Sequence, residues 1–114
     1  WGWGADGRLG NGTTANKYVP TYVDGGTTWA SVAAGYNHTC ATKSDGTLWC
    51  WGYNTIGQLG DGTQTARKTP TYVDAGSAWA SVSGGSAHTC GTKSDGTLWC
   101  WGLNYQNVPT QVGD

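Results

Sequence analysis

Short runs rich in threonine, valine, tryptophan and tyrosine alternate along this chain with turns rich in glycine, asparagine and aspartate. Leucine and alanine do not recur at helical spacing and glutamate is absent, so the pattern does not favour helices. β-Branched and aromatic residues are typical of strands, and the residues between the runs are typical of turns. The pattern therefore predicts an all-β chain. The strand candidates in its first part are residues 21–23, 29–34, 38–43 and 47–51.

The clearest turn has the sequence Ser-Asp-Gly and occurs twice, at residues 44–46 and 94–96. It has the composition of a three-residue hairpin loop, in which a type I turn is followed by a glycine in the left-handed region. The surrounding residues 38–52 recur at 88–102 with a single change. We therefore expect two equivalent hairpins. Their candidate turn residues are Asp45, Gly46, Asp95 and Gly96.

The register set by this loop brings the four cysteines together in pairs. Counting outward from the loop places Cys40 opposite Cys50, and Cys90 opposite Cys100. Directly opposed residues at a non-hydrogen-bonded position come close enough for a disulfide. A zinc site is the alternative, because His38 shares a strand face with Cys40, but each repeat would supply one ligand too few for a closed site. We therefore expect two disulfides within the hairpins, and no metal or other cofactor.

The sequence repeats with a period of 50 residues, and residues 29–52 and 79–102 differ at only five positions. Four short strand candidates in each period are the content of one β-propeller blade. We therefore treat residues 1–114 as a single repeat domain. Its parts are repeat one (1–50), repeat two (51–100) and a truncated third repeat (101–114) that ends in an outer strand.

Three outer-strand segments, 21–23, 71–73 and 109–112, serve two hairpins, so one of them lacks a partner within the chain. Two blades cannot close a propeller, and an unclosed pair leaves sheet edges and apolar faces open to solvent. Repeat proteins need about three or more units to bury a continuous core. We therefore expect the blades to be completed by other copies of this chain or by the remainder of a longer propeller chain.

Charge and composition exclude several classes of partner. The net charge is −1 and only 11% of the residues are charged, so no basic patch is available for nucleic acid. No apolar run is long enough to span a membrane. Paired cysteines favour an oxidising compartment, so we expect a secreted, extracellular protein. With neither a signal peptide nor an initiator methionine, the sequence reads as a processed form or as a piece of something longer.

No set of residues has the spacing of a catalytic site. His38 and His88 lack a consistent nucleophile and orienting carboxylate nearby, and the seven acidic residues are aspartates that mostly stand beside glycine in turns. The glycine-rich loop at residues 57–63 has no following lysine or helix that would suit a phosphate, so it is interpreted as a packing loop. We expect that the protein is not an enzyme.

The aromatic residues are the main candidates for binding. Most tryptophans recur with the period of the fold, which indicates packing between blades. Other aromatic residues do not repeat faithfully and could contact a protein or a glycan. These candidate contact residues are Trp3, Tyr36, Tyr53 and Tyr105. Asn11 and Asn37 fit the N-glycosylation pattern, and Asn11 is the better acceptor because Asn37 lies at a strand start.

Three motifs point to a known family. They are Trp-Gly-x-Asn-x-x-Gly-Gln-Leu-Gly-Asp-Gly-Thr at 51–63, Gly-x-x-His-Thr at 85–89 and Asp-Gly-Thr-Leu-Trp at 95–99. In this order they resemble the regulator-of-chromosome-condensation repeats, and the His-Thr-Cys version resembles a secreted bacterial branch. The resemblance covers nearly the whole chain. It implies a β-propeller, typically seven-bladed, with structural histidines near the inner ends of the blades.

Together these observations favour a secreted structural or interaction module that assembles head-to-tail into a ring or filament by strand exchange. Two other functions remain open: an inhibitor-like, protein-binding fragment of a longer propeller, and a carbohydrate-binding propeller. The nucleotide-exchange activity of the family belongs to a complete intracellular propeller and is the weaker alternative.

Overall fold

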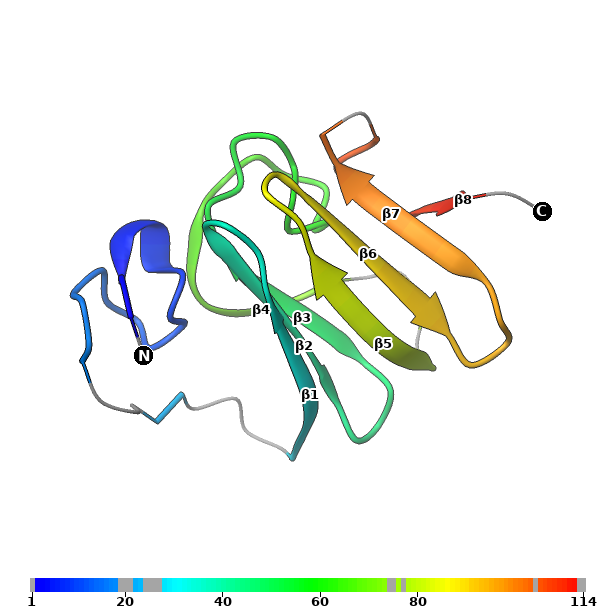
Figure 1. The fold of residues 1–114 in the computed structure, drawn as a ribbon, viewed down its shortest axis with the longest axis horizontal. Coiled ribbons are helices and arrows are strands. Elements are labelled where there is room, and N and C mark those ends of the chain that lie inside the picture. The colour runs from blue at the N-terminus through cyan, green and yellow to red at the C-terminus, as the bar shows by residue number, and fades with distance from the viewer. Residues whose placement is uncertain are drawn as a thin grey trace.

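The computed structural model describes residues 2–18, 22–23, 28–73, 76, 78–103 and 105–112. It contains two four-stranded antiparallel sheets, which lie side by side in Figure 1. The first sheet, blade 1, consists of β1 (Trp29–Ala34), β2 (His38–Lys43), β3 (Leu48–Gly52) and β4 (Arg67–Tyr72). The second sheet, blade 2, consists of β5 (Trp79–Gly84), β6 (His88–Lys93), β7 (Leu98–Gly102) and β8 (Thr110–Val112). A single 3-10 turn, η1 (Ala5–Gly7), precedes the strands in the described residues. The all-β prediction is confirmed.

The two hairpins have the register that their loops predict. Gly46 and Gly96 have φ angles of 86° and 90°, in the left-handed region that side chains resist. Cys40 and Cys50 are directly opposed in β2 and β3, and the corresponding cysteines are opposed in β6 and β7. Both pairs form disulfides, with Cα atoms 4.1 Å apart. The expected pairing of Cys40 with Cys50 and of Cys90 with Cys100 is therefore confirmed.

The boundaries of the blades differ from the boundaries of the sequence repeats. Each hairpin takes its outer strand from the following repeat, because β4 pairs with β3 and β8 pairs with β7. The strand expected at residues 21–23 is not part of blade 1: Thr21 lies outside the described residues, and Tyr22 and Val23 are not in a strand. The assignment of that segment to the first hairpin was therefore wrong.

The segment before blade 1 keeps one pairing that is typical of an outer strand, although it belongs to no sheet. Gly2 forms an antiparallel bridge with Lys17, which is the same pairing, 50 residues earlier, as Gly52 with Arg67. Since β8 is paired with β7, the segment without a hairpin of its own is the one that contains Lys17.

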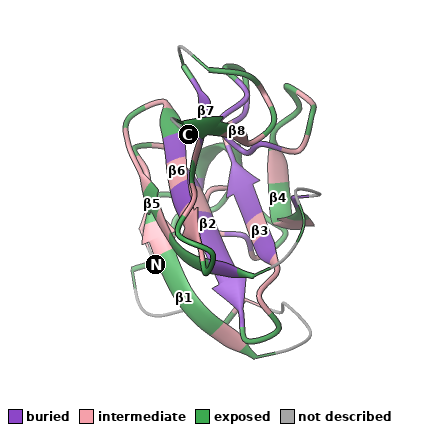
Figure 2. Ribbon diagram, turned by 90° about the vertical axis from the view of Figure 1, so that its right-hand side faces the viewer, coloured by how far each residue is buried: buried purple, intermediate pink, exposed green. Residues whose placement is uncertain are grey.

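The core lies between the two blades rather than within either sheet. Blade 1 contributes Leu48 and the disulfide Cys40–Cys50, and blade 2 contributes Trp79 and Trp101. Leu59 and Val73, which lie before and after β4, complete the cluster. Figure 2 shows the buried positions along β2 and β3, whereas β1 is mostly exposed. One sheet thus buries its inner face only because the next sheet covers it.

Among the described residues, no helix has the length and apolar character needed to cross a membrane. The same residues contain no group of three or more histidine, cysteine or acidic side chains that could hold a metal ion.

Candidate interaction surface

A buried hydrogen-bond relay joins the two blades. Nε2 of His38 lies 2.7 Å from Oγ1 of Thr89, and that hydroxyl donates to the backbone carbonyl of Gln58 at 2.7 Å. Because the threonine proton goes to the carbonyl, Oγ1 accepts from the ring, which assigns the Nε2–H tautomer to His38. The relay connects β2 of blade 1 to β6 of blade 2 and to the loop before β4.

The environment of His38 keeps its imidazole neutral. Burial, and to a lesser extent the neighbouring His88, lower the pKa of His38 to about 4. Its Nδ1 is buried and has no hydrogen-bond partner among the described residues, so a second ring proton would lack an acceptor. The relay therefore depends on an uncharged ring.

The inner ends of the blades approach too closely for side chains. The backbone nitrogen of Tyr36 donates to the carbonyl of Gly85 at 3.2 Å. A Cβ on Gly84 would lie 2.7 Å from the nitrogen of Gly35, and a Cβ on Gly35 would lie 2.7 Å from the carbonyl oxygen of Gly85. Such separations would force the backbone to move, so glycine at these positions sets the spacing of the blades.

The glycine-rich loop packs on blade 2, as expected. A Cβ on Gly60 would lie 2.6 Å from Nε1 of Trp101, and a Cβ on Gly57 would lie 2.6 Å from Cβ of Asn107. The loop is held from inside by Asn54, whose side-chain amide donates to the carbonyl oxygens of residues 63 and 65. The loop is therefore a packing element that covers the tryptophan of the next blade.

We call the contact between blade 1 and blade 2 the joint. Each free side of the blade pair carries the counterparts of one half of this joint. The acceptor face consists of the residues that lie 50 positions before those that contact the β2–β3 hairpin of blade 1. Its members are Leu9, Val23, Trp29, Val32, Thr39 and Trp51. We define the donor face as the blade 2 residues that lie 50 positions after the blade 1 side. Its members are His88, Cys90, Leu98 and Cys100.

Equivalent residues differ in burial according to whether a neighbouring blade covers them. Leu48 is fully buried at the joint, whereas Leu98 on the donor face is 39% exposed. Val82 packs against the core, whereas Val32 on the acceptor face is 70% exposed. His88 is exposed although its counterpart His38 is buried. The two faces are therefore an apolar, incompletely covered surface.

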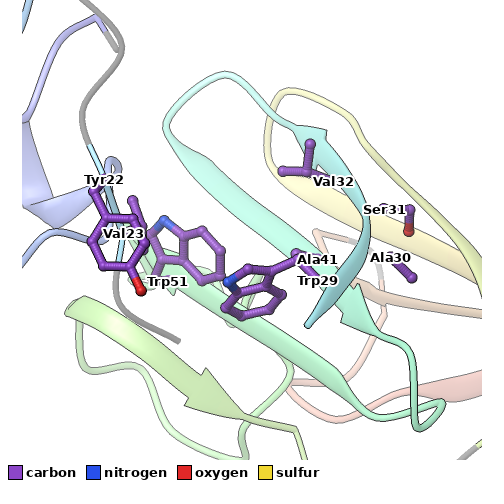
Figure 3. A pocket seen from close by; sticks show the side chains of 8 residues that line it. All are labelled: Tyr22, Val23, Trp29, Ala30, Ser31, Val32, Ala41 and Trp51. Atoms are coloured by element: carbon purple, nitrogen blue, oxygen red, sulfur yellow. The ribbon is translucent and has the colours of Figure 1, made fainter. Parts of the chain in front are cut away.

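A pocket of about 550 Å³ opens on the acceptor face. Figure 3 shows the indole rings of Trp29 and Trp51 next to each other, with Tyr22 beside Trp51. The two rings meet edge to face with their centroids 5.7 Å apart, the same distance as between Trp79 and Trp101 in blade 2. In blade 2 that position faces the disulfide and the leucine of blade 1. The pocket therefore lies at the position where, in blade 2, the neighbouring blade packs.

Two sequence profiles, both described as "Regulator of chromosome condensation (RCC1) repeat", match most of the chain. One covers residues 1–42 and 45–91, and the other covers residues 29–58 and 79–107. The chain belongs to this family. No curated protein is significantly similar to it in sequence.

Solved RCC1-type propellers share the fold of this blade pair. A crystal structure of human WBSCR16 superposes with a TM-score of 0.86 at 25% identity, over 97% of this chain and 32% of that one. Prp20p from Saccharomyces cerevisiae gives 0.83 at 21% identity, over 100% and 33%. The same yeast protein bound to Kap60 gives 0.77 at 21% identity, over 95% and 31%. The chain thus spans about a third of the length of these propellers.

The candidate contact residues of this RCC1-type pair lie in different places. Tyr36 and Trp3 are 76% and 66% exposed and line a second, smaller pocket together with Arg8 and Thr39. Tyr105 is 45% exposed, and Tyr53 is half-buried. The structure therefore brings Trp3 and Tyr36 together at the acceptor face. Tyr53 and Tyr105 are not part of that pocket.

The candidate turn aspartates hold their own loops. Hydrogen bonds from the hydroxyl and backbone of Thr47 hold the pKa of Asp45 below its usual value, and Thr97 does the same for Asp95. These carboxylates accept from residues two positions ahead, which stabilises the turn.

The two candidate glycosylation residues also have local partners. Oδ1 of Asn11 accepts from the backbone and hydroxyl of Thr13, as Asp61 does from Thr63 in the next repeat. Asn37 receives a bond of 3.4 Å from the side chain of Gln58, whose backbone carbonyl accepts from Thr89 of blade 2.

Sequence reasoning missed the lysines that precede each hairpin loop. Nζ of Lys43 lies 4.0 Å and 5.0 Å from the ring centroids of Trp49 and Trp29. Lys93 repeats these cation–π contacts with its own two tryptophans in blade 2, at 4.6 Å and 5.0 Å. A lysine recurring at a fixed distance from repeating tryptophans was a usable signal for this contact. The relay partner Thr89 was also missed, because it lies on another blade.

Proposed function

We propose that this chain is a protein-binding module that acts as part of a β-propeller and associates through the acceptor and donor faces of its blade pair. The observation that carries the proposal is that these faces are the two unmatched halves of the joint already formed between blade 1 and blade 2. A surface that carries one half of a joint fits a partner that carries the other half. The paired cysteines support the further proposal that this binding takes place outside the cell.

The solved relatives support binding to proteins rather than to small molecules. The yeast structure of Prp20p is described with its binding to Gsp1p and histones, and the same protein is seen bound to Kap60. These partners belong to that protein, and the sequence of the present chain does not favour histone-like or nucleic-acid partners over others. What carries over to this chain is the use of a propeller for protein contacts.

The finer proposal is that the partner is a second copy, joined head-to-tail by strand exchange. In blade 1, Tyr72 of β4 lies opposite Trp49 and meets its ring edge-on at 5.5 Å. In blade 2 the corresponding residue opposite Trp99 is Gln111, which cannot make this contact. Tyr22, 50 residues before Tyr72, is 83% exposed. A second copy could therefore replace β8 at the edge of β7 and add an aromatic pair.

Head-to-tail association is heterologous, so it uses two different faces at every contact. This gives a direct test with two variants, each of which places a lysine on one exposed face: V32K on the acceptor face and L98K on the donor face. Sedimentation equilibrium should show that wild type forms particles larger than one chain and that each variant alone is monomeric. A mixture of the two variants should form 1:1 dimers and nothing larger, because one intact face of each kind remains.

Strand exchange has its own test in Q111Y. A tyrosine there should pair with Trp99 in the same chain, hold β8 in place and weaken association relative to wild type. Dimers of V32K alone would contradict a head-to-tail contact, because they would require two donor faces to meet. Wild type that stays monomeric at all concentrations would refute self-association and leave the faces for further blades of a longer chain.

A further inference from the structure

We propose that the joint between two copies is completed by a hydrogen bond from Nε2 of His88 in one copy to Oγ1 of Thr39 in the next. This inference rests on the proposed head-to-tail association and names the polar contact that fixes its register. The occupant of the acceptor face is thus the β6–β7 hairpin of a second copy. The internal contact between His38 and Thr89 is the template.

Thr39 is already oriented for this contact. Its hydroxyl donates to the backbone carbonyl of Arg8 at 2.7 Å, as the hydroxyl of Thr89 donates to Gln58 at 2.7 Å. With its proton committed to that carbonyl, Oγ1 of Thr39 can only accept. In blade 2 the equivalent oxygen accepts from a histidine on the neighbouring blade. The hydroxyl oxygen of Thr39 is therefore a preorganised acceptor at the place where a histidine would arrive.

His88 is held in the same way as His38. Each histidine is opposed by a glycine across its hairpin, Gly102 for His88 and Gly52 for His38. The backbone nitrogen of Gly85 donates to the carbonyl of His88 at 2.8 Å, and Gly35 makes the same 2.8 Å bond to His38. In both repeats the ring of the histidine packs against this preceding glycine. The donor ring is therefore positioned by its own hairpin before any partner binds.

The two joints are not identical at this place. Arg8 stands where Gln58 stands in the internal joint, and its guanidinium pairs with Asp6 at 3.0 Å. In both repeats it is the backbone carbonyl at this position that accepts from the threonine hydroxyl, so the change of side chain leaves Thr39 oriented.

The test is a double-mutant cycle on association. H88F removes the donor without disturbing the internal relay, because His88 is exposed in the single chain. T39V removes the acceptor. Loss of one interfacial hydrogen bond of ordinary strength should weaken the dissociation constant about tenfold for each variant. If the two groups touch across the joint, H88F/T39V should be no weaker than either single variant.

Sedimentation equilibrium at pH 7.5 measures these constants. Circular dichroism and urea unfolding of each variant serve as controls for the fold. Additive effects of the two substitutions would overturn the contact while leaving self-association in place. Wild type that never associates would instead refute the self-association on which the contact rests, so the two failures are distinguishable.

Discussion

Blade 1 and blade 2 contain almost the same hairpin in two different environments. Residues 38–52 and 88–102 differ at one position, yet His38 and Leu48 are buried whereas His88 and Leu98 are not. The difference comes from the neighbour, because blade 2 covers the side of blade 1, and none of the described residues covers the side of blade 2 in the same way. In a repeat protein the burial of a residue therefore depends on the contacts between neighbouring units. Two units with the same sequence need not contribute equally to stability.

The largest expected difference between the blades concerns the leucine before each Trp-Cys-Trp. Leu48→Lys places an ammonium in the fully buried core and should cost about 4 kcal/mol or more, enough to unfold a marginally stable chain. Leu98→Lys, at a position that is 39% exposed, should change stability by less than about 1 kcal/mol. Urea unfolding of both variants measures the contrast. Equal losses would mean that both leucines are equally buried in solution.

The second prediction concerns the response of buried His38 to pH. The pKa of His38 is lowered from 6.5 to about 4, so the unfolded chain binds more protons than the folded chain between these values. Stability from this group is complete above pH 6.5 and is lost as the pH falls toward 4, by about 3 kcal/mol in total.

Urea unfolding of H38Q at a series of pH values should give a flatter profile over this window than wild type, at the cost of lower stability at pH 7. A profile that H38Q does not flatten would show that other groups cause the acid sensitivity.

A third contrast separates backbone strain from crowding at the hairpin glycines. G46A and G96A both put a side chain at a positive φ, which costs about 1 kcal/mol. A Cβ on Gly46 would in addition lie 2.8 Å from the backbone nitrogen of Ala78, whereas a Cβ on Gly96 meets nothing within 4 Å. G46A should therefore be the more destabilising variant in thermal unfolding. If G96A proved as costly as G46A, the crowding at Ala78 would not exist in solution.

Much of the fold could be predicted because it is specified locally. The Ser-Asp-Gly loop fixes the register of each hairpin, and that register alone predicts the disulfide Cys40–Cys50. The bounds of β1 and β2 were also predicted, because they match the segments 29–34 and 38–43. Short-range turn chemistry is encoded within a few residues, so one sequence is enough to read it.

The relations between repeats could not be predicted in this way. The segment 21–23 was grouped with the β2–β3 hairpin of its own repeat, because the repeat period does not indicate which sheet each strand joins. The relay from His38 to Thr89 joins residues 51 positions apart, and no local pattern marks it. The signal that was available is periodicity itself: Thr39 and Arg8 recur as Thr89 and Gln58, so one solved joint predicts where the next would lie.

The smallest expected effect concerns Ala34, which is bulkier than its counterpart in blade 2 and lies where the two blades approach most closely. In blade 2 this position is Gly84, and a Cβ there would lie 2.7 Å from the backbone of Gly35. A second copy that docks on blade 1 would meet the methyl group of Ala34 with its own Gly85, so the joint between copies must open slightly relative to the internal one.

A34G removes this methyl group and should tighten association by about threefold, corresponding to roughly 0.6 kcal/mol. The residue lies at the end of β1 and is exposed, so its effect on the single chain should stay within about 1 kcal/mol. G84A is the matched control and should instead destabilise the single chain, because it crowds a joint that is already closed. Sedimentation equilibrium for A34G and thermal unfolding for G84A separate the two effects, and weaker association of A34G would show that copies do not meet in the geometry of the internal joint.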